Sequence, residues 1–125
     1  MLRKAALISF IFCCTNFAHA QSAPPENELH FGNLPPNSSQ RFHEIIDSWA
    51  ECVWYEAKAH SKSFETDEEV AAAALVLCDF KEARAVDYAT GAYGTANGVR
   101  IITSLASEIK RKIIPIVSAD RRNEK

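Results

Sequence analysis

The chain of 125 residues has little glycine, little proline and no excess of basic charge. Four glycines and five prolines are too few for a fibrous or low-complexity chain. The net charge of −2 argues against a strongly basic nucleic-acid-binding protein, so we expect no nucleic-acid partner. The hydrophobic content of 47% is ordinary for a globular protein, and the length suffices for one small domain.

The first twenty residues have the three parts of a secretory signal peptide. Arg3 and Lys4 give a cationic start, an apolar run extends from Ala5 to Cys14, and an Ala-x-Ala sequence ends at Ala20. The apolar run is well short of the ~20 residues that span a bilayer. We therefore predict cleavage after Ala20 and an exported protein, periplasmic or secreted, that is not transmembrane once the signal is removed.

Cleavage leaves two of the four cysteines, Cys52 and Cys78. An exported chain with an even number of cysteines normally pairs them. The mean of the two residue numbers is 65, which falls in the turn predicted between the first two helices described below. If these helices form an antiparallel hairpin, both cysteines lie at the same height along the facing helices. We predict a structural disulfide. The alternatives are two buried free thiols or a redox pair, although a redox pair usually has the Cys-x-x-Cys spacing.

Residues 21–38 are rich in proline and asparagine and predict a disordered arm. From Ser39 an apolar stripe predicts a first helix that fades near residues 60–63, with Ser38 or Ser39 as its N-cap. Thr66 and Glu69 form a capping-box pattern that starts a second helix, from residue 67 to about 89. The apolar block 70–78 covers every side of that helix and predicts burial by more than one neighbour.

Gly91, Gly94 and Gly98 predict a turn, followed by a third amphipathic helix from about Asn97. Pro115 predicts a kink or an early end of that helix, and we expect a frayed, charged tail from about residue 118. The predicted fold is all-α: a small three-helix domain over residues 39–125. An antiparallel hairpin with one disulfide forms most of it, and the last helix packs across the hairpin.

No catalytic constellation is visible in the sequence, and we expect a non-enzymatic protein without cofactor or metal. His60 follows Glu56 by four residues, and Asp47 follows His43 by four, so each pair shares one helix face. Zinc sites need three or four protein ligands, whereas each face offers two. Solvated helix side chains explain both pairs better. An enzyme with an unrecognised site stays open as an alternative.

Charge is unevenly distributed along the chain. Residues 44–87 hold eleven acids and four bases, whereas residues 107–125 hold six bases and three acids. The basic last helix either packs beside the acidic hairpin or meets an anionic surface of a partner. Aromatic residues off the main stripes often anchor interfaces, and the alternative is that they close the edges of a small core. The candidate interaction surface therefore comprises Trp54, Tyr55, Tyr93, Lys110, Arg111 and Lys112.

These features favour an exported binding or interaction protein, with another protein or an envelope surface as its partner. In size, export and cysteine count the chain is similar to the small one-disulfide helical acid-stress chaperones of the bacterial periplasm. That resemblance carries no motif, and it implies an acid-responsive chaperone as the alternative function. Helical content or oligomeric state would then change between about pH 6 and pH 3.

Overall fold

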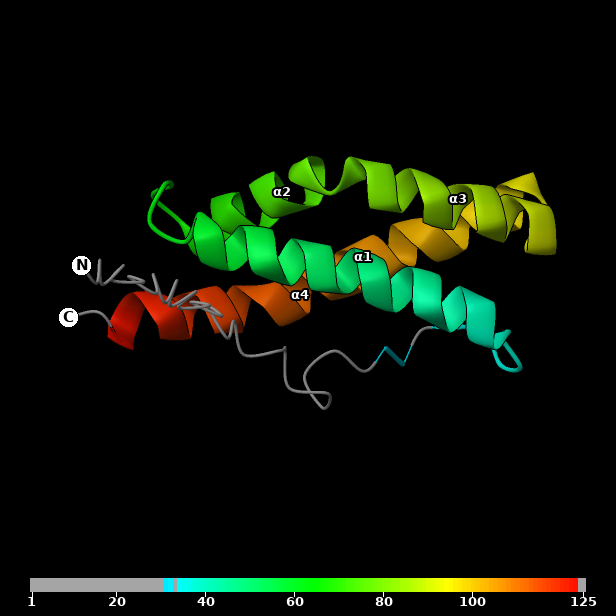
Figure 1. The fold of residues 1–125 in the computed structure, drawn as a ribbon, viewed down its shortest axis with the longest axis horizontal. Coiled ribbons are helices and arrows are strands. Elements are labelled where there is room, and N and C mark those ends of the chain that lie inside the picture. The colour runs from blue at the N-terminus through cyan, green and yellow to red at the C-terminus, as the bar shows by residue number, and fades with distance from the viewer. Residues whose placement is uncertain (1–30, 33, 124–125) are drawn as a thin grey trace, which may run out of the picture.

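The computed structural model describes residues 31–32 and 34–123, and these residues form four α-helices and no strands. The helices are α1 (Gln40–Ala59), α2 (Asp67–Leu77), α3 (Asp79–Tyr93) and α4 (Thr95–Asn123). Helices α2 and α3 follow one another along one side, and α1 and α4 run alongside them in the opposite direction (Figure 1). The all-α class is confirmed. The predicted signal peptide lies outside the described residues.

Two helix starts confirm the capping patterns read from the sequence. The Ser39 hydroxyl accepts a hydrogen bond from the amide of Phe42 at 3.1 Å, which satisfies one free amide at the start of α1. At α2 the amide of Glu69 donates to the Thr66 hydroxyl at 3.2 Å, and the amide of Thr66 donates to the Glu69 carboxylate at 3.1 Å. The capping box therefore fixes where α2 begins.

Helices α1 and α4 supply most of the core. Their apolar residues recur at spacings of three and four, so each helix has one continuous buried side. Burial of this apolar surface is the main stabilising contribution in a domain without sheets. The largest fully buried side chains are Trp49, Phe42, Ile46, Ile102, Leu105, Ile109, Ile113, Val53, Val70 and Val117, together with Cys78.

The predicted disulfide is confirmed. Cys52 of α1 is bonded to Cys78, and their Cα atoms lie 6.0 Å apart. The bond closes a loop between residues separated by 26 positions. In the chain-entropy account, a loop of this length stabilises the fold by about 3–4 kcal/mol. That is a large contribution to a domain whose total stability is of the order of 5–15 kcal/mol.

The prediction of one continuous helix from residue 67 to about 89 is wrong. The chain breaks at Cys78, which ends α2 and precedes α3, with φ −102° and ψ 20°. The prediction that the whole apolar block is buried is also wrong, because Val76 is 70% exposed and Leu77 is 49% exposed. Val70, Ala71 and Ala74 do face the core. Neighbouring helices cover that side of α2 and leave its outer side open.

Of the two outcomes expected at Pro115, a kink or an early end of the helix, the early end is wrong, and so is the frayed tail. Helix α4 begins at Thr95 and continues through Pro115 to Asn123. Proline removes one backbone hydrogen bond, but fully buried Ile113 and Val117 on either side hold this stretch against the core.

The end of α4 is also tied to the loop between α1 and α2. The Arg121 guanidinium donates to the Asp67 carboxylate at 2.9 Å and to the carbonyl oxygens of Phe64 and Glu65 at 2.8 and 3.0 Å. Nearby, Lys58 of α1 forms an ion pair with Asp120 at 3.6 Å. These contacts place part of the basic end of the chain beside the acidic hairpin, as one of the two sequence interpretations expects.

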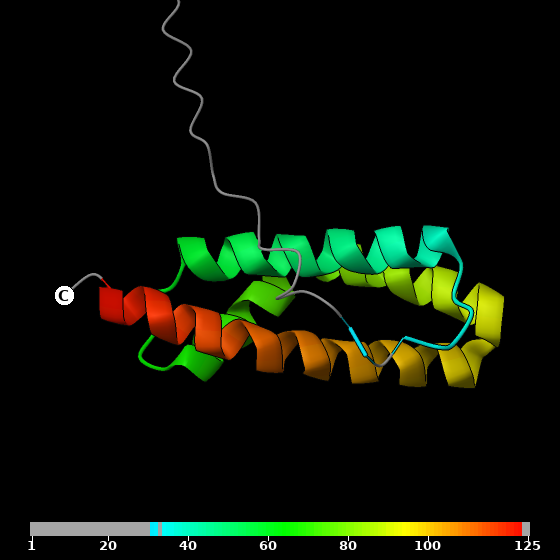
Figure 2. The same cartoon turned by 90° about the horizontal axis from the view of Figure 1, so that it is seen from below.

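In the segment before α1, Phe31 and Gly32 contact α4, so the prediction of a disordered arm does not hold for these two residues. Phe31 is 4% exposed, and the amide of Gly32 donates to Oε1 of Glu108 at 3.0 Å. The Lys112 ammonium lies 5.6 Å from the centroid of the Phe31 ring. Figure 2 shows this segment beside α4, leading back to the end of the bundle where α1 begins.

The turn between α3 and α4 is tighter than the three glycines predicted, because only Gly94, with φ 86°, leaves the helical conformation. Gly98 instead lies within α4 and packs directly against the backbone of α3. A Cβ atom added there would lie 2.5 Å from the amide nitrogen of Thr90 and 2.7 Å from the carbonyl carbon of Ala89. Gly91 of α3 has nothing within 4 Å of such an atom.

We expect Gly98→Ala to lower the free energy of unfolding by about 1–3 kcal/mol, because the added methyl group forces the two backbones apart. The matched substitution Gly91→Ala should raise it by about 0.5–1 kcal/mol, since alanine is the better helix former where space is open. Urea unfolding followed by circular dichroism measures both. Equal effects of the two substitutions would contradict the close approach of α3 and α4.

A second pair of variants tests the packing of the end of α4. Arg121→Ala removes two hydrogen bonds to the loop before α2 and one to Asp67 at the start of α2, and should lower the free energy of unfolding by about 1–2 kcal/mol. The neighbouring Arg122 is exposed and donates to Ser118 within its own helix. Its replacement by alanine should change stability by less than about 0.5 kcal/mol. The same urea titration distinguishes them, and a frayed helix end would make the two variants alike.

Candidate functional site

The most exposed apolar side chains of α2 and α3 gather around the break between them. Val76 is 70% exposed, Leu77 49% and Phe80 61%. We call these three residues the apolar ridge. An isolated exposed apolar residue is common on protein surfaces, but a contiguous group is typical of interaction sites.

The disulfide explains why the ridge faces outward. Cys78 has no exposed surface and its sulfur is bonded to α1, so this position must face the interior. Successive residues of a helix are about 100° apart, so a residue two positions away lies about 200° round the axis. Val76, two positions before Cys78 in α2, therefore points away from the core, and Phe80 in the first turn of α3 is likewise exposed. A polar residue at either position would satisfy the fold equally well.

Three carboxylates border the ridge along the outer side of α3. Asp79, Glu82 and Asp87 line an open hollow whose remaining lining residues are Ala83 and Val86. No hydrogen bond or ion pair joins these three carboxylates to any other side chain in the described part of the chain. We call this feature the acidic hollow. It combines an apolar floor with uncompensated negative charge.

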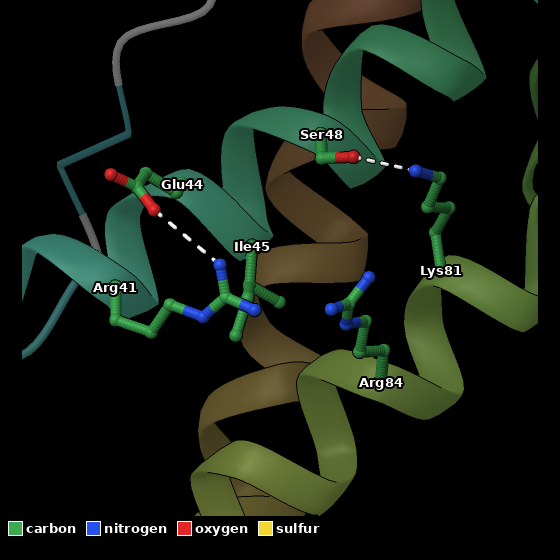
Figure 3. Close-up of a pocket in the computed structure, with 6 residues that line it drawn as sticks. All are labelled: Arg41, Glu44, Ile45, Ser48, Lys81 and Arg84. Carbon is green, nitrogen blue, oxygen red and sulfur yellow. Dashed lines mark hydrogen bonds and ion pairs between the residues drawn. The ribbon is translucent and has the colours of Figure 1, made fainter.

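A second, smaller pocket lies between α1 and α3 and has the opposite charge. Its lining residues are Arg41, Glu44, Ile45, Ser48, Lys81 and Arg84, and its volume is about 100 Å³. Figure 3 shows the guanidinium groups of Arg41 and Arg84 extending toward one another from the two helices. Lys81 donates to the Ser48 hydroxyl at 2.7 Å. We call this the cationic pocket.

On α3 the cationic pocket and the acidic hollow face different directions. Lys81 and Arg84 lie on the side of the helix that faces α1, whereas Glu82 and Val86 lie about 100–200° away at the usual helical spacing. One short helix therefore presents an anionic surface and a cationic surface that do not merge. The ridge residue Phe80 lies between them in angle.

The structure does not bring the predicted aromatic anchors together at the surface. Trp54 is only 6% exposed, with its ring edge-on to Tyr55 at 4.9 Å between centroids and with Lys58 4.9 Å above it. The expectation that Trp54 is an exposed anchor is wrong, because Lys58 and Tyr55 cover it. Tyr55 itself is half-buried.

Tyr93 lies at the other end of the bundle from Tyr55. Its half-buried ring packs against Phe42, with 5.8 Å between centroids, and its hydroxyl lies 3.5 Å from that of Ser38. The basic candidates on α4 are likewise divided: Arg111 is exposed, Lys110 is half-buried and Lys112 lies over Phe31. The six residues predicted as one interaction surface therefore do not form a single patch.

The two His–acid pairs predicted on helix faces lie at or near the surface. His60 Nε2 lies 3.5 Å from a Glu56 carboxylate oxygen, with both side chains about 40% exposed, and His43 is exposed. Among the described residues, no group of three or more His, Cys, Asp or Glu side chains is placed to hold a metal ion. None of the described helices is long and apolar enough to cross a membrane.

Comparison of the chain with protein-family models, with curated proteins and with solved structures finds no match.

Proposed function

We propose that this is an exported, non-enzymatic binding protein and that the apolar ridge is its docking surface. The observation that carries the proposal is the exposure of Val76, Leu77 and Phe80 beside a fully buried, disulfide-bonded Cys78. Apolar side chains of this size gain free energy when a partner removes them from water. The disulfide keeps the ridge in one position, so little conformational freedom is lost on binding.

The neighbouring charges define the partner. The acidic hollow provides three carboxylates without ionic partners, at Asp79, Glu82 and Asp87, directly beside the ridge. A partner segment with basic side chains next to apolar ones complements both features at once. We therefore assign the ridge and hollow to a basic, amphipathic segment of another protein. An apolar segment flanked by acids would be repelled by the same carboxylates.

The test uses a model peptide of leucine and lysine with helical spacing, and a counterpart with glutamate in place of lysine. The protein should bind the lysine peptide, and rising salt should weaken binding because the hollow contributes by charge. The glutamate peptide should not bind. Fluorescence anisotropy of a labelled peptide measures both affinities.

Two matched variants locate the surface. Phe80→Ser should weaken binding of the lysine peptide by about tenfold or more, as expected for the loss of a central apolar anchor. Phe64→Ser is the same chemical change in the loop before α2, where Phe64 is 38% exposed, and should leave binding unchanged. Because both phenylalanines are substantially exposed, neither change should alter stability by more than about 0.5 kcal/mol. Equal affinities of the two variants would refute the assignment of the ridge.

The same experiment separates this function from that of an acid-responsive chaperone. Docking at the ridge needs the folded, disulfide-bonded junction of α2 and α3, so lowering the pH should not raise the affinity for the lysine peptide. A chaperone of that kind would gain affinity for apolar clients as it loses packing. An affinity that rises as the pH falls would therefore indicate the chaperone function.

A further inference from the structure

We propose that the cationic pocket between α1 and α3 is a binding site for a small oxyanion, that is, a carboxylate or phosphate group. This site lies on the α1-facing side of α3, away from the acidic hollow, and the inference stands independently of docking at the ridge.

Positive charge exceeds negative charge in the cationic pocket. Three cations, Arg41, Lys81 and Arg84, line it together with the single carboxylate of Glu44. Arg84 forms no hydrogen bond or ion pair with any of the described residues. Like charges that line one pocket repel one another, and an anion placed between them removes that repulsion.

The cations converge at this pocket although acidic residues are abundant in the same part of the sequence. Residues 44–87 contain eleven acids and only four bases, and two of those bases are Lys81 and Arg84. Being three positions apart on α3, they share one side of the helix, and that side faces Arg41 of α1. A merely solvated pair of bases has no need to meet a third cation from another helix.

The cationic pocket is also partly preorganised. The hydrogen bond of 2.7 Å from Lys81 to Ser48 holds the ammonium group at the pocket wall. Arg41 and Glu44 are 3.5 Å apart, and their side chains are 56% and 54% exposed. An exposed ion pair of this kind is weak, so the Arg41 guanidinium is available to a competing anion.

Size and shape define the class of ligand. The pocket has a volume of about 100 Å³, a small space that suits a single carboxylate or phosphate group. Guanidinium groups bind both anions through pairs of parallel hydrogen bonds. Ile45 supplies one apolar wall, against which a short aliphatic part of the ligand would pack.

The experiment titrates the full exported chain with acetate and, separately, with inorganic phosphate at constant ionic strength set by chloride. Backbone amide chemical shifts follow binding. We expect saturable shifts at Ser48, Lys81 and Arg84, with the tighter of the two probes identifying the ligand as a carboxylate or a phosphate. Shifts that fail to saturate, or that are spread over all basic residues, would overturn the proposal.

Variants from both helices make the result specific. Arg84→Gln and Arg41→Gln should each weaken binding of the tighter probe by about tenfold, the effect of one lost charge-assisted hydrogen bond. Arg100→Gln is the matched control, because Arg100 is an exposed arginine of α4 that contacts Asn97 of its own helix. An equal loss of affinity in all three variants would mean non-specific attraction and would overturn the site.

Discussion

The disulfide between Cys52 and Cys78 is the constraint on which the arrangement of the surface depends. It fixes one position of the α2–α3 segment against α1, and Cys78 is both the end of one helix and the residue before the next. Because Cys78 must face inward, Val76, two positions before it in α2, must face outward, and Phe80 is exposed at the start of α3. Covalent pairing in the interior thus determines which apolar side chains reach the solvent. A domain this small has limited core area, which makes such a cross-link unusually important.

Helix α3 contributes both to the packing of the bundle and to the two charged surfaces. Its buried side consists of small residues, Ala85 and Ala89, and Gly98 of α4 packs against its backbone. Small side chains on the inside allow neighbouring helices to approach closely, so α3 lies firmly between α1 and α4. Its outer side carries the acidic hollow and its α1-facing side carries two cations of the cationic pocket. Rigid placement of these charges is what makes each surface selective for one sign of partner charge.

Much of the fold follows from local patterns in the sequence, whereas the candidate sites depend on register. The all-α class, the caps at Ser39 and Thr66 and the disulfide are encoded by spacing and residue type alone. The break at Cys78 and the exposure of Val76 are not encoded in this way. A nine-residue apolar block has the same sequence pattern whether two or three neighbouring helices cover it. A signal was nevertheless present: a cysteine bonded to α1 implies that Val76 faces away. Pairing the hairpin symmetrically about residue 65 also places Lys81 and Arg84 opposite residues 46–49, close to the observed pocket. Packing of Phe31 and Gly32 against α4 had no comparable local signal, since Lys112 and Glu108, which they contact, lie 81 and 76 positions further along the sequence.

The most direct test of the account is whether the docking surface requires the cross-link. The measurement is the affinity of the leucine–lysine peptide for the double variant Cys52→Ala/Cys78→Ala, compared with the oxidised protein. Both are measured at a low temperature where circular dichroism shows that the variant keeps its helices. We expect the double variant to bind the peptide clearly more weakly, because the α2–α3 junction is no longer fixed and the ridge loses its preorganisation. Unchanged affinity in a fully helical variant would contradict the role assigned to the disulfide.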